Sequence, residues 1–180
     1  MKVQLLTWSA GYPLPTLLRI ALLILHNPPY KPLDLVLSYC HLTLQNDTLK
    51  TLGPLFRHRA QVGQVLNASP LSMGLLTPTP PLWHPAPKGV ITAAKYAYDI
   101  AATWAGGLPN LALGYAMRYS LAAGMPLAVG FSSPNEVHES VRVWRKIQER
   151  DDDDSRRAKE AEVICVFEKD QLKNSSWPCP

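Results

Sequence analysis

The 180-residue chain is long enough for one domain with its own hydrophobic core, and its 47% apolar and 18% charged residues exclude a disordered protein. Its net charge of +4 comes without runs of Lys and Arg interleaved with aromatic residues, which argues against nucleic-acid binding. The three cysteines, at positions 40, 165 and 179, have no CxxC spacing, which argues against a disulfide framework and a metal site and favours a cytoplasmic protein.

The first strand and helix are predicted near the beginning of the chain. Val3–Thr7 reads as a strand, and the helix that follows has Pro15 in its first turn and ends near His26. Its apolar run, residues 17–25, is much shorter than the roughly 20 residues of a membrane span, and Arg19 interrupts it. No membrane segment or secretory signal is therefore expected, and the helix is interpreted as amphipathic and buried.

Two further strands and one helix follow. Leu33–Tyr39 is apolar enough to be a strand buried on both faces. Asp47 is expected to cap the helix from Thr48 to about Arg59, because its carboxylate can accept from free N–H groups. The next strand is predicted over Val62–Ala68.

The middle of the chain predicts a long crossover followed by a last strand. A Pro-rich loop over residues 77–87 precedes a helix near Thr92–Trp104, and Pro109 opens a further helix over Asn110–Tyr119. The first of these helices has an apolar face composed of Ala93, Ala97, Ile100 and Trp104. The fourth strand is expected over Pro126–Phe131.

A complete helix-start signal follows that strand. Ser133 is a predicted N-cap, Pro134 the first helical residue, and Glu136 the closing residue of a capping box. The inward stripe of this helix, which runs to about residue 150, is predicted to be Val137, Val141 and Trp144.

The C-terminal part begins with four aspartates at 151–154, which indicate a solvated linker rather than a metal site because consecutive side chains do not converge. An amphipathic helix is expected from Arg156 to Lys169. The chain is thus divided into residues 1–150, which carry the strand–helix units, and residues 151–180, an acidic linker, a helix and a tail.

Four strand–helix units in series predict an α/β fold with parallel strands and right-handed crossovers. A complete (β/α)8 TIM barrel needs about 250 residues and eight units. The expected fold is therefore a partial barrel of about four units plus C-terminal helices. Its open strand edges and apolar faces favour self-association.

Familiar catalytic motifs are missing, since the sequence contains no GxGxxG, GxxxxGK[ST] or GxSxG pattern. Cys40 and His41 could form a nucleophile–base pair, but neighbouring strand residues point to opposite faces, which favours a packed cysteine. His84, within Trp83-His84-Pro85, is interpreted as part of a rigid surface turn, with a place at a substrate mouth as the alternative.

Two loops are candidates for binding an anion. Residues 69–76 and 132–135 follow the last two strands, where barrels of this class hold phosphates. The second loop leads into a capped helix, whose free N–H groups and dipole attract negative charge. From the residues alone, the alternative that these serines only cap and turn the chain is equally supported.

The chain resembles the aldo-keto reductase family, in its branch of plant and fungal aldose 1-dehydrogenases that act on L-galactose and D-arabinose. The resemblance rests on five stretches that occur in order and at comparable spacing: residues 36–41, 67–76, 83–87, 106–113 and 129–133. It covers most of residues 11–147 and implies that residues 1–150 are the C-terminal half of a (β/α)8 barrel.

The resemblance implies a hydride transfer between NAD(P) and a carbonyl or alcohol carbon of a small-molecule sugar. It also implies that Ser69, Leu71 and Met73 cover the cofactor pyrophosphate. It further implies that Ser132 and Ser133 bind the adenosine side of the cofactor and that Glu139 contacts the adenine.

Three positions depart from the family pattern. Ala68 replaces the aromatic residue that stacks on nicotinamide, Val36 replaces the Gln that holds the carboxamide, and Glu136 replaces an Arg that binds the adenosine phosphate of NADP. An acid at that position would repel a 2′-phosphate, so NAD is expected rather than NADP.

The family's catalytic Asp, Tyr, Lys and His come from the first four strands, upstream of the aligned part, so no catalytic residue is assigned here. Without the tetrad there is no proton relay, and the chain alone is expected to be an inactive, truncated or degenerate dehydrogenase. The alternative is a non-catalytic remnant that binds a nucleotide or a partner, associating through its open barrel edges.

Overall fold

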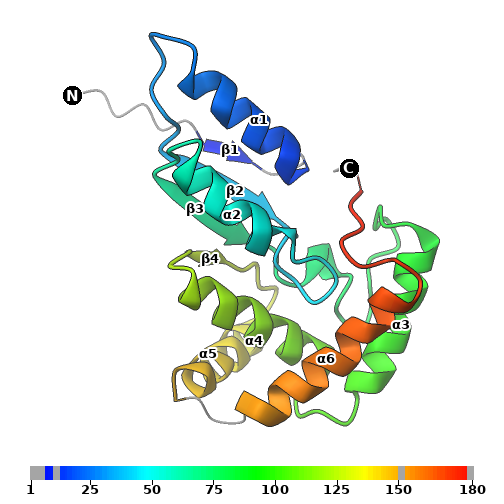
Figure 1. The fold of residues 1–180 in the computed structure, drawn as a ribbon. Helices are drawn as coiled ribbons and strands as arrows, with labels where there is room; N and C mark the ends of the chain where they lie inside the picture. Colours follow the sequence, from blue (N-terminus) through cyan, green and yellow to red (C-terminus); the bar gives the residue numbers. More distant parts are fainter. Residues whose placement is uncertain (1–6, 10–12, 150–152, 178–180) are drawn as a thin grey trace.

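The computed structural model describes residues 7–9, 13–149 and 153–177 (Figure 1). Its four short strands form one sheet in the order β1-β2-β3-β4, and each strand pairs in parallel with the next. The strands are β1 Thr7–Ser9, β2 Leu35–Tyr39, β3 Gln64–Ala68 and β4 Leu127–Ala128. The parallel, sequential arrangement is confirmed as an open sheet. The predicted strand Val3–Thr7 lies outside the described residues except for Thr7.

Six α-helices and one 3₁₀ turn accompany the sheet. They are α1 Leu14–Leu25, α2 Thr48–His58, η1 Ser72–Gly74, α3 Lys88–Ala101, α4 Gly107–Ala122, α5 Pro134–Glu149 and α6 Asp153–Lys169. Figure 1 shows α1 and α2 over the sheet, α5 beyond the opposite edge, and α6 alongside α3. Among the described helices, none has the length and apolar character needed to cross a membrane.

The amphipathic reading of the first helix is confirmed. Proline stands in the first turn of α1, where its missing N–H costs nothing, and the helix buries Leu14, Leu17, Leu18 and Ala21 at helical spacing. This stripe belongs to one continuous core that also contains Val36 of β2 and Val65 of β3. The helices therefore cover one face of the sheet.

The prediction that β2 is buried on both faces is wrong. Val36 and Ser38 are buried, whereas Leu35, Leu37 and Tyr39 on the other face are only half-buried. Apolar residues on both faces are usual for parallel strands, but here the helices cover only one of them.

Asp47 does not cap α2, contrary to expectation. Asn46 takes that role, since its Oδ1 accepts from the N–H and the hydroxyl of Thr48 at 3.1 and 2.7 Å. The Asp47 carboxylate instead lies 3.2 Å from Lys50 Nζ and 3.6 Å from Lys173 Nζ. The attraction of two ammonium groups outweighs the cap.

The inward stripe predicted for α5 is also wrong. Val137, Val141 and Trp144 are 40, 43 and 39% exposed. The buried positions of the helix are Ser140, Val143 and Ile147, and the last two pack with Leu113 and Met117 of α4. Two apolar stripes alternate along this helix, and periodicity alone does not tell which one meets a neighbour.

The crossover helix α3 begins earlier than predicted, at Lys88, and ends at Ala101, so Trp104 lies outside it. Ala93 and Ala97 are buried as expected, and Ile100 and Trp104 pack partly against the core.

The last helix is confirmed but begins at Asp153, so the described end of the acidic run is helical, and it is not amphipathic as expected, because its buried face carries Arg156 and Glu160 beside Val163 and Phe167. It buries Arg156, Glu160, Val163 and Phe167 and packs against α3 and α4. The Arg156 guanidinium donates to the main-chain and side-chain oxygens of Asn110, at 3.1 and 2.9 Å. A Cβ at Gly114 would collide with Nη1 of that arginine, so a larger residue there would displace the guanidinium from Asn110.

Candidate functional site

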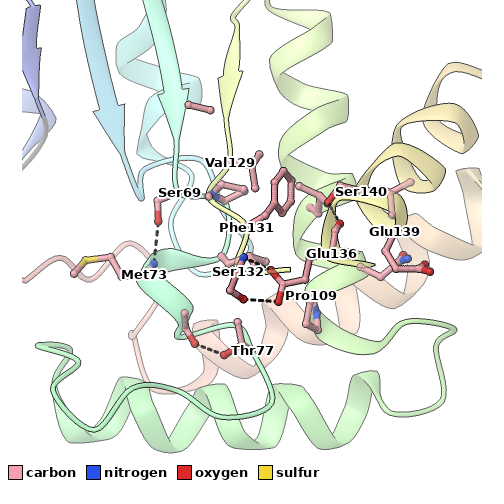
Figure 2. A pocket seen from close by; sticks show the side chains of 18 of the residues that line it. Ser69, Met73, Thr77, Pro109, Val129, Phe131, Ser132, Glu136, Glu139 and Ser140 are labelled. Atoms are coloured by element: carbon pink, nitrogen blue, oxygen red, sulfur yellow. Dashed lines mark hydrogen bonds between the residues drawn. The ribbon is translucent and has the colours of Figure 1, made fainter. Parts of the chain in front are cut away.

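A cavity of about 960 Å³ opens at the carboxyl ends of β3 and β4 (Figure 2). The loop after β3, the loop after β4, and the first turns of α4 and α5 form its walls, which are mostly apolar. Of the six residues singled out from the sequence, five line it: Ser69, Leu71, Met73, Ser132 and Glu139. Ser133 is not among the lining residues.

The loop after β3 has an uncommon backbone. Ser69, Ser72 and Met73 have φ values of 58°, 50° and 58°, in the left-handed region that non-glycine residues rarely adopt. Such conformations persist only where surrounding contacts hold them, and they concentrate at functional sites. Here the N–H of Met73 donates to Ser69 Oγ at 2.9 Å and the N–H of Ser72 to the Ser69 carbonyl at 3.0 Å (Figure 2 shows the first).

His84 supports this loop from behind. It is 6% exposed, its Nε2 lies 2.8 Å from the Ser72 carbonyl, and the N–H of Ala86 donates to its Nδ1 at 3.2 Å. A ring that accepts at Nδ1 must donate from Nε2, which fixes the neutral tautomer. The ring also packs edge-on against Trp177 at 5.2 Å. The interpretation of His84 as part of a surface turn is therefore wrong, and His84 is not among the residues that line the cavity.

The Glu136 carboxylate occupies the hydrogen-bond donors just before the start of α5. Glu136 accepts from the N–H and the hydroxyl of Ser132 at 2.8 and 2.7 Å, as Figure 2 shows. The bond from the Ser132 N–H, followed by that from its hydroxyl, holds the pKa of Glu136 below its usual range. The capping box is thus half right: Ser133 Oγ accepts from the Glu136 N–H at 3.3 Å, but the carboxylate binds Ser132 rather than the N-cap.

Negative side chains dominate the electrostatics of the cavity. Glu136 and Glu139 line it, and none of the described lining residues is Lys, Arg or His. Glu139 also pairs with Arg142, which is 69% exposed. The lining therefore offers carboxylate acceptors for hydroxyl groups of a ligand, and it disfavours a phosphate group next to Glu136.

An Asp–Lys–Tyr cluster lies elsewhere, between α2 and α4. Lys50 Nζ lies 2.6 Å from the Tyr115 hydroxyl, which in turn donates to Asp47 at 3.1 Å. Burial, reinforced by the Asp47 carboxylate, raises the pKa of Tyr115 well above its usual range. A tyrosine with a raised pKa is a poor proton donor, and none of the three residues lines the cavity. The cluster holds helices together.

The structure at the end of β2 agrees with the prediction that Cys40 is a packed residue rather than a nucleophile paired with His41. Cys40 is 8% exposed, and His41 Nδ1 lies 3.4 Å from Ser38 Oγ. Burial lowers the pKa of His41 to about 4, so it is neutral at neutral pH. Within the described parts of the chain, no group of three His, Cys, Asp or Glu side chains could hold a metal ion.

Sequence comparison supplies two relatives. The chain is 33% identical over 156 residues to L-galactose dehydrogenase of Arabidopsis thaliana, an alignment that covers 86% of this chain and 46% of the relative. It is 36% identical over 110 residues to D-arabinose 1-dehydrogenase of Saccharomyces cerevisiae, covering 58% of this chain and 31% of that protein.

The chain therefore spans less than half the length of the relatives that it matches. No protein-family model matches the sequence. The resemblance drawn from the five sequence stretches is confirmed: this chain is a distant homologue of L-galactose dehydrogenase and D-arabinose 1-dehydrogenase over part of their length.

Proposed function

We propose that this chain binds NAD in the cavity at the ends of β3 and β4, as the cofactor-binding part of an aldo-keto reductase-type sugar dehydrogenase. The observation that carries the proposal is the convergence of both strand-end loops on one cavity. Five residues that the family resemblance marks line this cavity, although they lie as much as 70 positions apart in the sequence. In α/β barrels, cofactor phosphates bind at this end of the strands.

The residues present fit the adenosine part of the cofactor. The apolar walls suit a flat base, and carboxylates such as Glu136 and Glu139 can accept from ribose hydroxyls, as acidic residues do in other NAD-binding folds. The Ser69 hydroxyl is the polar group placed to meet the diphosphate, whereas the Ser132 hydroxyl already donates to Glu136. When bound, NAD supplies the hydride acceptor; the chain itself binds and orients it.

Glu136 favours NAD over NADP. Its carboxylate already holds the hydrogen-bond donors at Ser132, and it is ionised because those bonds lower its pKa. A 2′-phosphate at this rim would face a like charge and compete for occupied donors. We expect no sugar oxidation by the chain alone, because the proposed role is binding rather than proton transfer.

Isothermal titration of the chain with NAD and NADP tests the proposal. We expect NAD to bind about tenfold more tightly, because the 2′-phosphate of NADP would face the ionised Glu136. Glu136→Arg should reverse the preference, and Glu162→Arg, a matched charge change at an exposed site on α6, should leave it unchanged. Absence of binding by both nucleotides, or tighter binding of NADP to the unmodified chain, would overturn it.

A further inference from the structure

Residues 172–177, which follow α6 (red in Figure 1), are tied to the loop between β2 and α2. Gln45 and Asn46 of that loop are 0 and 2% exposed, and their side-chain amides donate to the Ser175 carbonyl at 3.1 and 3.4 Å. The Asn174 N–H donates in turn to the Gln45 carbonyl at 2.9 Å. Buried amides need such partners, so these contacts fix the path of residues 172–177, which we call the C-terminal tail.

Further contacts fasten the C-terminal tail to the same loop. Lys173 Nζ donates to the Leu44 carbonyl at 2.9 Å and lies 3.6 Å from the Asp47 carboxylate. The Asn174 side chain accepts from the Asp47 N–H at 2.8 Å. The tail therefore has a defined orientation, and its last described residue, Trp177, packs partly against the core.

Trp177 contacts the ring of His84. The two ring centroids lie 5.2 Å apart and the planes are inclined by 66°, which is an edge-on contact. On its other side, His84 Nε2 donates to the Ser72 carbonyl at 2.8 Å. The same carbonyl accepts from the Leu75 N–H at 3.1 Å. The imidazole thus connects the C-terminal tail to the loop after β3.

This connection ends in the strained part of the cavity wall. Ser72 and Met73 have φ values of 50° and 58°, and such conformations persist only where neighbours hold them. Met73 lines the cavity, whereas His84 and Trp177 are not among its lining residues. A neighbour that fixes the Ser72 carbonyl therefore shapes the cavity without touching a ligand in it.

We propose that Trp177 is a positioning residue for the cofactor: it orients His84, which holds the loop after β3 in the conformation that receives NAD. The inference rests on the proposed NAD binding and names a part of the chain outside the cavity on which the affinity depends. A loop that is held in its bound conformation beforehand spares the cost of ordering it when the ligand binds. Docking of the C-terminal tail and binding of NAD should therefore favour each other.

Isothermal titration with NAD gives the first readout. Trp177→Ala should weaken binding about three- to tenfold, the usual worth of an edge-on aromatic contact. Trp177→Phe should restore most of the affinity because it keeps a ring at His84. Leu52→Ala, which removes another half-buried side chain from the margin of the core, on α2, is the control. It should lower the stability to urea without changing the NAD affinity.

A double-mutant cycle distinguishes positioning through His84 from a merely structural role. His84→Phe keeps a ring at this position but removes the donor to the Ser72 carbonyl, and it should weaken NAD binding by a similar factor. If Trp177 acts through His84, adding Trp177→Ala to His84→Phe should weaken binding by less than about twofold more. Effects that multiply in full would overturn the proposal.

Amide hydrogen exchange reports on the loop without any ligand. The Met73 N–H donates to Ser69 Oγ and the Leu75 N–H to the Ser72 carbonyl. Relative to the amides of α4, both should exchange faster in Trp177→Ala and at an unchanged rate in Leu52→Ala. In the unmodified chain, NAD should slow exchange at the Asn174 N–H, although Asn174 is not among the residues that line the cavity.

The two readouts separate this inference from the proposed function. An unchanged NAD affinity in Trp177→Ala would overturn the role of Trp177 and leave the cofactor site standing. Absence of NAD binding by the unmodified chain would overturn the proposed function. Exchange at Met73 and Leu75 would then decide alone whether Trp177 positions the loop, and unchanged exchange in Trp177→Ala would refute it.

Discussion

The packing around α6 and the edge at β4 and α5 differ in how completely their apolar side chains are covered. On α6, Val163 and Phe167 are fully buried against α3 and the core. On α5, three large apolar residues are each about two-fifths exposed, although the helix is only one residue shorter than α6. The comparison shows that the apolar residues of α6 are covered by neighbouring helices, whereas one apolar stripe of α5 is exposed to solvent.

The polar contacts of the two regions differ in the same way. Arg156 and Glu160 are buried on α6 and reach Asn110 and Arg118 of α4. The Glu139–Arg142 pair on α5 is largely exposed and joins residues of the same helix. Buried contacts between helices fix their packing, whereas exposed pairs within one helix contribute little.

Truncating one aromatic residue in each region gives the largest contrast. Phe167→Ala should lower the free energy of unfolding by about 3–5 kcal/mol, because it leaves a cavity in a close-packed core. Trp144→Ala should cost less than about 1 kcal/mol in the dilute chain. Urea titrations at several protein concentrations measure both. Equal costs for the two variants would contradict the comparison.

Acid should lower the free energy of unfolding through His41, which follows β2. Its folded pKa of about 4 lies below the unfolded value of about 6.5, so the unfolded chain binds more protons between these values. Stability should therefore fall by about 3 kcal/mol as the pH decreases from 7 to 4. His41→Gln should flatten this part of the curve, whereas His138→Gln, on the exposed side of α5, serves as the control. A profile unchanged by His41→Gln would refute the assignment.

The smallest of these effects concerns the ion pairs of α6. Glu160→Ala removes a buried carboxylate that accepts from the partly exposed Arg118 and should cost about 2 kcal/mol, the usual worth of a hydrogen bond to a charged group. Glu162→Ala breaks the exposed pair with Lys159 on the same helix and should cost less than about 0.5 kcal/mol. Thermal unfolding of the two variants side by side checks the difference. Similar losses of stability would mean that burial does not determine the strength of these ion pairs.

The sequence predicted the elements better than their surroundings. Strand order and the α1 stripe follow from the local periodicity of apolar residues. The amphipathic character expected for α6 does not, because its buried face includes Arg156 and Glu160. The burial of β2 on both faces and the stripe of α5 were wrong because each depends on which neighbour covers a face. Local sequence does not encode that. The Asp47 cap failed because Lys173, 126 positions away in the chain, attracts its carboxylate.

The candidate site was predicted in its loops but not in its internal contacts. The loops after β3 and β4 were predicted to bind a ligand because they follow strand ends, and five of the six chosen residues line one cavity. The bond from Ser132 to Glu136 and the support of Ser72 by His84 were missed. Glu136 lies four residues after Ser132, within reach of a capping contact, so that spacing was the available signal. His84 carried no such signal, because it approaches Ser72 through a Pro-rich loop.

The most direct test of the central claim is an amide chemical-shift map of the chain titrated with NAD. The account predicts saturable shifts that cluster at the two strand-end loops, in Ser69, Met73, Gly130 and Ser132, with no comparable shifts near Lys50 and Tyr115. Shifts confined to other surfaces, or none at millimolar NAD, would contradict it.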